Sequence, residues 1–231
     1  MNHELIKESQ NPFDKFATWF NFAKNSKLVK DHTAFTLSTC NTNGEPDLRI
    51  VLLKEFKEDG FVFFTNQNSS KGIDLSLNQS VAACFYWDRL NLQIRIKGKA
   101  FKTNQIENDA YFASRSFASR IGACVSKQSS YLESRDRLLD EYSKMALNYG
   151  LEIDKSKLDI SPESVEEIDI LQNEFNDKII EQKPIARPIE WGGFLIKPTR
   201  FEFWINGRHR LHDRTIYELK NNEWKHFKIY P

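Results

Sequence analysis

The sequence predicts a mainly β fold, an antiparallel sheet with peripheral α-helices, on three observations. Short runs rich in Val, Ile, Phe and Thr recur along the chain, separated by turn-forming Asn, Asp, Gly or Pro. Helical spacing of apolar residues is confined to a few segments. The 231 residues and 40% hydrophobic content can bury one sizeable core, so we expect one domain. A closed or nearly closed small barrel is the most economical arrangement, because closure removes exposed strand edges.

Each element follows from its local pattern. A helix begins at Asn11-Pro12, because Phe13, Phe16, Phe20 and Ala23 recur at helical spacing. Strands are expected at 35–39, 48–56, 61–65, 81–87, 92–101, 193–205, 208–219 and 224–229, with turns at 43–46, 59–60, 88–91, 206–207 and 221–222. Helices are expected at 104–117 and 129–148.

Charge is distributed unevenly along the chain. Between Leu151 and Gln182 there are ten acidic residues and three lysines, a net charge of −7, so the remainder carries +8 of the overall +1. We interpret 149–188 as an acidic helical insert, with Ser161-Pro162 starting a helix. The basic remainder has no block of consecutive Lys or Arg and no nucleic-acid module, which favours small phosphorylated ligands over nucleic acid.

The segment from Arg208 to Arg214 is the most informative basic stretch. Asn206-Gly207 predicts a two-residue hairpin, which would place Arg210, His212 and Arg214 on one face of the returning strand. Like charges on one face repel each other unless an anion lies opposite, and Arg is suited to phosphate or carboxylate. A solvated strand face is the alternative interpretation.

Three other patterns also point to anions. The apolar run 49–54 is bounded by Arg49 and Lys54, as expected of a strand buried on both faces whose ends reach a polar site; solubilising end charges are the alternative. In the helix expected at 104–117 and just beyond it, Tyr111, Arg115 and Ser119 share one face and could surround a phosphate, although an ordinary exposed face would look the same. The polar run 126–130 is expected at a helix start, where free N–H groups favour anions or a serine simply caps the helix.

Cysteine usage and the N-terminal sequence indicate the compartment. Cys40, Cys84 and Cys124 are far apart and odd in number, which favours reduced thiols over a disulfide framework or a metal site. No apolar run has the length of a signal peptide or a membrane span. We therefore expect a cytoplasmic protein without a membrane segment and without a bound metal.

Taken together, the motifs resemble the pyridoxamine 5′-phosphate oxidase family. The resemblance runs from about Asp31 to the C-terminus, interrupted by the acidic insert. Its motifs are Arg49-Ile50-Val51-Leu52-Leu53-Lys54, Phe64-Thr65-Asn66, Ile121-Gly122-Ala123, Ser126-Lys127-Gln128-Ser129-Ser130, Trp191-Gly192-Gly193-Phe194 and Glu202-Phe203-Trp204 with Arg210-Leu211-His212-Asp213-Arg214. Each motif is modest alone, but their order and spacing are specific.

The resemblance implies an FMN-binding split β-barrel that works as a homodimer with flavin at the subunit interface. Matching positions imply FMN binding by Arg49, Ile50, Val51, Leu52, Leu53, Lys54, Phe64, Thr65, Lys71, Gln93, Gln128, Ser129, Trp204 and Arg214. They imply substrate binding by Lys54, Tyr111, Arg115, Ser119, Arg210 and His212, of which Arg210 and His212 would lie against the pyridine ring as catalytic residues.

The implied chemistry is oxidation of pyridoxine or pyridoxamine 5′-phosphate at C4′ to pyridoxal 5′-phosphate, a step in vitamin B6 cofactor biosynthesis and salvage. Hydride would pass to the flavin, O2 would reoxidise it to give H2O2, and the amine would also release ammonia. The alternatives are another split-barrel flavoprotein such as a flavin reductase, or a non-catalytic FMN or pyridoxal phosphate binding protein. Ser70 stands where the family usually has a basic residue, which implies one fewer cation for the FMN phosphate.

Overall fold

The computed structural model describes residues 3–153, 158 and 184–231. Its described strands form one antiparallel sheet in which β2, β1, β5, β6, β7, β4 and β3 are neighbours in that order, and β8 and β9 extend from β7. The strands are β1 (Ala34–Cys40), β2 (Pro46–Leu52), β3 (Glu55–Lys57), β4 (Gly60–Asn66), β5 (Ser80–Trp87), β6 (Leu92–Lys102), β7 (Trp191–Ile205), β8 (Asp213–Lys220) and β9 (Glu223–Lys228). The predicted mainly β fold is confirmed.

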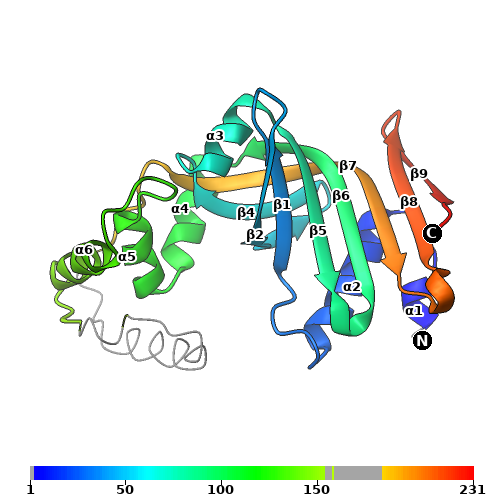
Figure 1. Ribbon diagram of the computed structural model, residues 1–231, viewed down its shortest axis with the longest axis horizontal. Helices are drawn as coiled ribbons and strands as arrows, with labels where there is room; N and C mark the ends of the chain where they lie inside the picture. Colours follow the sequence, from blue (N-terminus) through cyan, green and yellow to red (C-terminus); the bar gives the residue numbers. More distant parts are fainter. Residues whose placement is uncertain (1–2, 154–157, 159–183) are drawn as a thin grey trace. The chain divides into compact units, whose positions relative to one another are not determined.

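The described chain also contains α-helices, of which α2 packs against the sheet (Figure 1). They are α1 (His3–Ile6), α2 (Pro12–Asn25), α3 (Ser70–Leu77), α4 (Gln105–Ser114), α5 (Phe117–Val125) and α6 (Arg135–Leu147). The α2 helix begins as its sequence predicts, with the Asn11 side chain accepting the Phe13 N–H at 3.0 Å and Pro12 in the first turn. The α3 helix, by contrast, has no counterpart among the expected elements.

The described residues form two compact units. The first draws on 3–64, 73–102 and 194–231, and the second draws on 65–72, 103–153, 158 and 184–193. Neither unit is a continuous stretch of sequence, because β4, α3 and β7 each contribute residues to both. A single domain with a helical insert at 149–188 therefore stays a prediction, and the helix expected from Ser161 lies outside the described residues.

Aromatic side chains build the core of the first unit. Phe16 and Trp19 of α2 are almost fully buried, and Phe16 packs edge to face on Phe61 and Phe85 at centroid distances of 4.7 and 5.4 Å. Phe201 and Phe203 of β7 stack on each other at 5.9 Å. Such pairs add about 0.5–1.5 kcal/mol each beyond the burial of apolar area, so α2 is fixed firmly against the curved sheet.

Two-residue turns connect part of the sheet as the sequence predicts. Lys220 and Glu223 pair directly, and Asn221 and Asn222 between them have φ of 51° and 64°, the left-handed values of a type I′ hairpin.

The expected strand 48–56 is instead two strands, β2 and β3, because pairing with β1 stops at Leu52. In the described sheet β2 is at the end of the strand order, and its Leu48 and Ile50 are 67% and 70% exposed. The expectation that the strand over 49–54 is buried on both faces is therefore wrong for the single chain.

The second unit contains α4, α5 and α6. The buried Asn108 side chain ties α4 to the start of β7, because its Oδ1 accepts the Gly193 N–H at 2.8 Å and the Thr103 hydroxyl at 2.6 Å. Arg187 donates to Asp109 at 2.6 Å and to the Trp191 carbonyl at 2.6 Å. The chain that returns from the segment after α6 is thus held against α4 by side-chain hydrogen bonds.

Candidate active site

Three predicted cofactor residues form a row across adjacent strands of the first unit. Gln93 of β6 pairs directly with Trp204 of β7, and Trp204 pairs directly with Arg214 of β8. Residues opposite one another in an antiparallel pair point to the same face of the sheet. Gln93 therefore lies in one row with Trp204 and Arg214, although both follow it in the sequence by more than 100 residues.

A buried carboxylate holds the guanidinium of this row. Glu202 is 2% exposed, and its Oε1 accepts from Arg214 Nη2 at 2.6 Å and Nε at 2.8 Å, while Oε2 accepts from Arg95 at 3.0 Å. Arg214 Nη1 also donates to the Tyr230 carbonyl at 3.0 Å. Glu202 is thus the anion that accompanies the basic strand, and it fixes the plane of the Arg214 guanidinium.

The loop before β8 differs from the prediction. Strand pairing stops at Ile205 and Asp213, so 206–212 form a loop rather than a two-residue hairpin, and Arg210 and His212 are not on a strand with Arg214. The reason lies in Asn206 and Gly207. The Asn206 N–H bonds to the Asn91 carbonyl at 3.0 Å, and Gly207 has φ −111°, whereas a type I′ turn needs positive φ.

This loop orients the His212 imidazole. The Gly207 backbone N–H donates to His212 Nδ1 at 3.1 Å, and the imidazole lies 4.7 Å from the Trp204 ring centroid. An N–H can donate only to an unprotonated nitrogen, so the proton of the neutral ring is on Nε2. His209 and Arg210 have φ of 56° and 65°, a strained conformation for non-glycine residues of the kind that functional loops retain. Arg210 itself is exposed.

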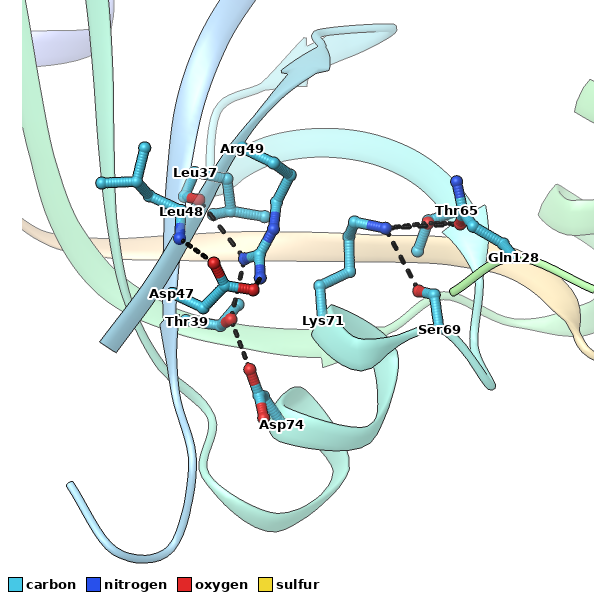
Figure 2. A network of polar contacts seen from close by, with 10 residues as sticks. All are labelled: Leu37, Thr39, Asp47, Leu48, Arg49, Thr65, Ser69, Lys71, Asp74 and Gln128. Atoms are coloured by element: carbon cyan, nitrogen blue, oxygen red, sulfur yellow. Dashed lines mark hydrogen bonds and ion pairs between the residues drawn. The ribbon is translucent and has the colours of Figure 1, made fainter. Parts of the chain in front are cut away.

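A buried ammonium lies in the second unit. Lys71 is 8% exposed, and its Nζ donates to Ser69 Oγ at 3.2 Å, Thr65 Oγ1 at 3.3 Å and Gln128 Oε1 at 3.3 Å (Figure 2). Thr65 also donates to Gln128 at 3.0 Å. A cation, two hydroxyls and an amide in one cluster match the groups that hold a phosphate monoester. Thr65, Lys71 and Gln128, three predicted cofactor residues, are therefore neighbours.

Ser129 follows Gln128 in a loop rather than at the start of a helix. The α5 helix ends at Val125 and α6 begins only at Arg135, so the expected helix start at 126–130 is wrong. Ser134, not a serine of that run, caps α6 by accepting the Arg137 N–H at 3.2 Å. The loop instead lines an open cavity of about 580 Å³, and Ser129 has φ 69°.

Arg49 forms a separate cluster in the first unit. Its Nη1 donates to Thr39 Oγ1 at 2.7 Å, and its Nη2 forms an ion pair with Asp47 at 2.6 Å, while Thr39 donates to Asp74 at 2.7 Å (Figure 2). The other predicted residues near it differ in burial: Ile50, Leu52 and Lys54 are exposed, Val51 is half-buried and Leu53 is buried. Phe64 is on β4 and half-buried. In the strand order, β1, β5 and β6 separate Arg49 on β2 from Trp204 on β7.

The predicted phosphate face of Tyr111, Arg115 and Ser119 spans two helices instead of one. The α4 helix ends at Ser114 with Arg115 as its C-cap, and Ser116 caps α5 by accepting the Ser119 N–H at 3.3 Å. The expected continuous helix over this stretch is therefore wrong. Ser116 and Ser119 are hydroxyl neighbours at 2.9 Å, so the break still keeps polar groups next to Arg115 in sequence.

Aromatic rings frame the Arg115 guanidinium. Its carbon lies 4.8 Å from the Trp191 ring and 5.7 Å from the Phe112 ring, and Tyr111 stacks on Trp191 at 6.1 Å. Burial lowers the pKa of Arg115 and raises the pKa of Tyr111. Arg115 Nη1 is buried without a hydrogen-bond partner among the described residues. This nitrogen therefore has a donor that an anion could accept.

Sequence reasoning assigned no site role to several residues in or next to these clusters, among them Trp191, Glu202, Gly207 and Arg120. The Trp191 ring lies against the Arg115 guanidinium. Glu202 accepts a hydrogen bond from Arg214, and the Gly207 N–H donates to His212. Arg120 has a buried Nε that meets no hydrogen-bond partner in the described part of the chain, as Arg115 has a buried Nη1. Its only sequence signal is a second arginine five positions after the first.

Comparison with solved structures identifies the class of this fold, the split β-barrel. The structure matches PhzG from Burkholderia lata with a TM-score of 0.80 at 23% identity, covering 100% of this chain and 98% of that one. It matches a pyridoxamine 5′-phosphate oxidase-related, FMN-binding protein from Nostoc punctiforme with a TM-score of 0.67 at 16% identity, covering 97% and 100%. At these identities the match concerns the fold, and it confirms the predicted split barrel.

The chain belongs to the pyridoxamine 5′-phosphate oxidase family. The family model described as "Pyridoxamine 5'-phosphate oxidase" matches residues 23–148, and "Pyridoxine 5'-phosphate oxidase C-terminal dimerisation region" matches 191–231. The chain is 38% identical to a pyridoxine/pyridoxamine 5′-phosphate oxidase of Paraburkholderia phytofirmans over 96% of this chain and 90% of that protein. It is 36% identical to a pyridoxine/pyridoxamine 5′-phosphate oxidase of Christiangramia forsetii over 99% of this chain and 93% of that protein. The predicted family and the expectation of an oxidoreductase are confirmed.

Proposed function

We propose that this protein oxidises pyridoxine 5′-phosphate and pyridoxamine 5′-phosphate to pyridoxal 5′-phosphate, with FMN as cofactor and O2 as electron acceptor. H2O2 is the co-product, and the amine also releases ammonia. The single observation that carries the proposal is Arg115, whose buried Nη1 has no partner among the described residues and whose flanking Trp191 ring suits a phosphate attached to an aromatic ring. The names of the relatives support the same substrates.

The residues present fit FMN. The cluster of Lys71, Thr65, Ser69 and Gln128 supplies an ammonium, hydroxyls and an amide suited to the ribityl phosphate. The row Gln93, Trp204 and Arg214 offers hydrogen-bond donors and an aromatic surface suited to a flavin ring. We assign to FMN the predicted set Arg49 to Lys54, Phe64, Thr65, Lys71, Gln93, Gln128, Ser129, Trp204 and Arg214.

For the substrate, we assign phosphate binding to Lys54, Tyr111, Arg115 and Ser119, and contact with the pyridine ring to Arg210 and His212. Binding the phosphate away from the reacting carbon lets the protein align that carbon, which is how remote binding energy accelerates a reaction. The His212 ring can donate a hydrogen bond from Nε2, because its Nδ1 accepts the Gly207 N–H. FMN held by the assigned residues would supply the two-electron redox chemistry, with O2 as the electron acceptor.

We also propose that the protein works as a homodimer. Residues 191–231 match a family segment described as a dimerisation region. On β2, which ends the described strand order, Leu48, Ile50 and Leu52 alternate along one exposed face. An exposed apolar row on an edge strand favours pairing with another chain. A second copy would also bring another Arg49 cluster, which three strands separate from Trp204 within one chain.

We place the working protein in the cytoplasm as a single functional domain of 1–231. The three cysteines, Cys40, Cys84 and Cys124, are free thiols, which suits a reducing compartment. No helix in the described part of the chain is long and apolar enough to cross a membrane.

The decisive experiment follows pyridoxal phosphate and peroxide together while FMN-loaded protein turns over pyridoxine 5′-phosphate in air. Equal amounts of both products support the proposal. Bound FMN without turnover would indicate a binding protein, the alternative that Ser70 motivates. Flavin reduction by a nicotinamide cofactor, with no oxidation of the substrate, would indicate a flavin reductase.

A further inference from the structure

Two arginines of the second unit have buried guanidine nitrogens that lack a hydrogen-bond partner among the residues that the structure describes. They are Arg115 through Nη1 and Arg120 through Nε, and the two other unpartnered buried side-chain atoms of the described residues, on Trp87 and Ser143, belong to neutral groups. Both unsatisfied cationic donors thus fall within one stretch of six residues at the α4–α5 break.

The backbone of this break holds both arginines in place. The Arg115 N–H donates to the Phe112 carbonyl at 3.2 Å and so ends α4, and the Arg120 N–H donates to the Ser116 carbonyl at 3.0 Å in the first hydrogen-bonded turn of α5. The Arg115 guanidinium is fixed further by the faces of Trp191 and Phe112. The described contacts of Arg115 are therefore aromatic faces and a backbone hydrogen bond, and those of Arg120 include its backbone hydrogen bond to Ser116.

Among the residues that the structure describes, no acidic side chain compensates the charge of Arg115. The charged or titratable groups that act on it are Tyr111, Cys124 and Arg120, and the Arg120 guanidinium, being of like charge, lowers the Arg115 pKa in the same direction as burial does. A partly buried cation without a partner destabilises a folded protein, and a second cation beside it adds repulsion. An arrangement of this kind becomes favourable when an anion with several acceptor oxygens joins the two guanidinium groups.

We propose that Arg120 is a second phosphate-binding cation, which together with Arg115 holds the phosphate of the phosphorylated substrate. This inference rests on the proposed function and adds to it a residue outside the predicted set of Lys54, Tyr111, Arg115 and Ser119. A phosphate monoester has three terminal oxygens, so Arg115 and Arg120 can each donate to a different oxygen. Two guanidinium groups also select the phosphorylated vitamer over the free alcohol.

The test measures binding to FMN-loaded protein by isothermal titration, with pyridoxal 5′-phosphate, inorganic phosphate and unphosphorylated pyridoxal as probes. Arg120→Gln removes the charge but retains an amide donor. It should weaken binding of both phosphate-bearing probes roughly tenfold or more, the loss of one charge-assisted hydrogen bond, and leave pyridoxal binding unchanged. The matched control is Arg89→Gln, because Arg89 is 75% exposed in the β5–β6 turn, and it should bind all three probes as the wild type does.

Thermal unfolding gives a second readout, which separates phosphate binding from a structural role. Without phosphate, Arg120→Gln should be at least as stable as the wild type, because the repulsion between the Arg115 and Arg120 guanidinium groups is gone. Added phosphate should raise the Tm of the wild type more than that of the variant. The proposal would be overturned by a variant that is less stable than the wild type with and without phosphate, but whose folded molecules bind phosphate with the affinity of the wild type.

Two other outcomes would also overturn it. If Arg120→Gln lost FMN affinity and retained affinity for pyridoxal phosphate, the cation would belong to the flavin phosphate. If it bound every probe as the wild type does, Arg120 would have no part in the site. Failure of the wild type to oxidise either vitamer would refute the proposed function separately, because the inorganic phosphate titration does not depend on turnover.

Discussion

At the scale of single residues, hydrogen bonds in this protein determine what each site residue can do. Arg214 has its guanidinium occupied by Glu202 and the Tyr230 carbonyl, so it serves as a fixed donor plane. His212 has Nδ1 occupied by the Gly207 N–H, which leaves Nε2 as its donor nitrogen. A cationic strand face was the prediction, whereas the structure shows one neutralised arginine and one oriented imidazole.

The orientation of His212 predicts different effects for two substitutions. His212→Asn keeps an acceptor for the Gly207 N–H but loses the Nε2 donor, so stability should hold while kcat/KM falls roughly tenfold, as expected for one hydrogen bond. His212→Gln loses the acceptor near Gly207, so it should lose about 1 kcal/mol of stability but keep a donor and more of the activity. Steady-state kinetics and urea unfolding would check both, and a ¹⁵N NMR spectrum showing the proton on Nδ1 would contradict the assignment.

At the scale of elements, the second unit depends on the packing of α5 against α6. The Tyr142 hydroxyl of α6 donates to the Ala118 carbonyl of α5 at 3.2 Å. Burial raises the pKa of Tyr142 from 10.0 to about 12. The folded state therefore keeps this phenol protonated at pH values where the unfolded chain has lost the proton.

The Tyr142 shift predicts a loss of stability in alkali. The protonated Tyr142 hydroxyl contributes fully to the free energy of unfolding below pH 10. This contribution disappears as the pH rises from 10 to about 12, because the folded state retains a proton that the unfolded chain has lost. Partial exposure reduces its size to roughly 1–2 kcal/mol. Urea unfolding of Tyr142→Phe across this range should show a smaller alkaline loss than the wild type, and Tyr131→Phe, at a 92% exposed position, should match the wild type. Equal losses in wild type and Tyr142→Phe would contradict the assignment.

At the scale of the whole molecule, the single chain leaves an apolar face on β2. The row of Leu48, Ile50 and Leu52 is 67%, 70% and 39% exposed. If this row lies in the proposed homodimer interface, a charge placed there must be desolvated on association. The exposure of this face in one chain therefore leads to a prediction about two chains.

Leu48→Lys should weaken the homodimer by an order of magnitude or more in Kd, because a buried unpaired ammonium costs more than about 1.4 kcal/mol. The matched control is Ile106→Lys, which introduces the same charge at an 82% exposed position on α4. Sedimentation velocity over a concentration series would measure both. Unchanged dimerisation of Leu48→Lys would place the interface elsewhere.

Local patterns predicted much of this molecule. Strand positions followed from alternating apolar runs, and the Asn221-Asn222 turn followed from residues that tolerate positive φ. The Asn206-Gly207 hairpin prediction failed because a distant residue, Asn91, takes the Asn206 N–H. The break between α4 and α5 was missed because Ser116 can cap a helix as well as continue one, and only packing decides between these roles.

The roles of the site residues stay predictions. Residue types and the family resemblance pointed to Arg115, Lys71 and His212, since each is a charged or titratable side chain at a position that matches the family. Sequence patterns could not show that Glu202 neutralises Arg214 or that Gly207 orients His212, because those contacts depend on strand register and loop conformation.

Oxidation of pyridoxine 5′-phosphate by this protein is tested most directly by anaerobic mixing of FMN-loaded protein with that substrate. We expect the flavin absorption to bleach in a single turnover, one pyridoxal 5′-phosphate to form per flavin, and O2, when admitted, to restore the absorption with release of H2O2. A flavin that stays oxidised in the presence of saturating substrate would contradict the assignment of this protein as a pyridoxine and pyridoxamine phosphate oxidase.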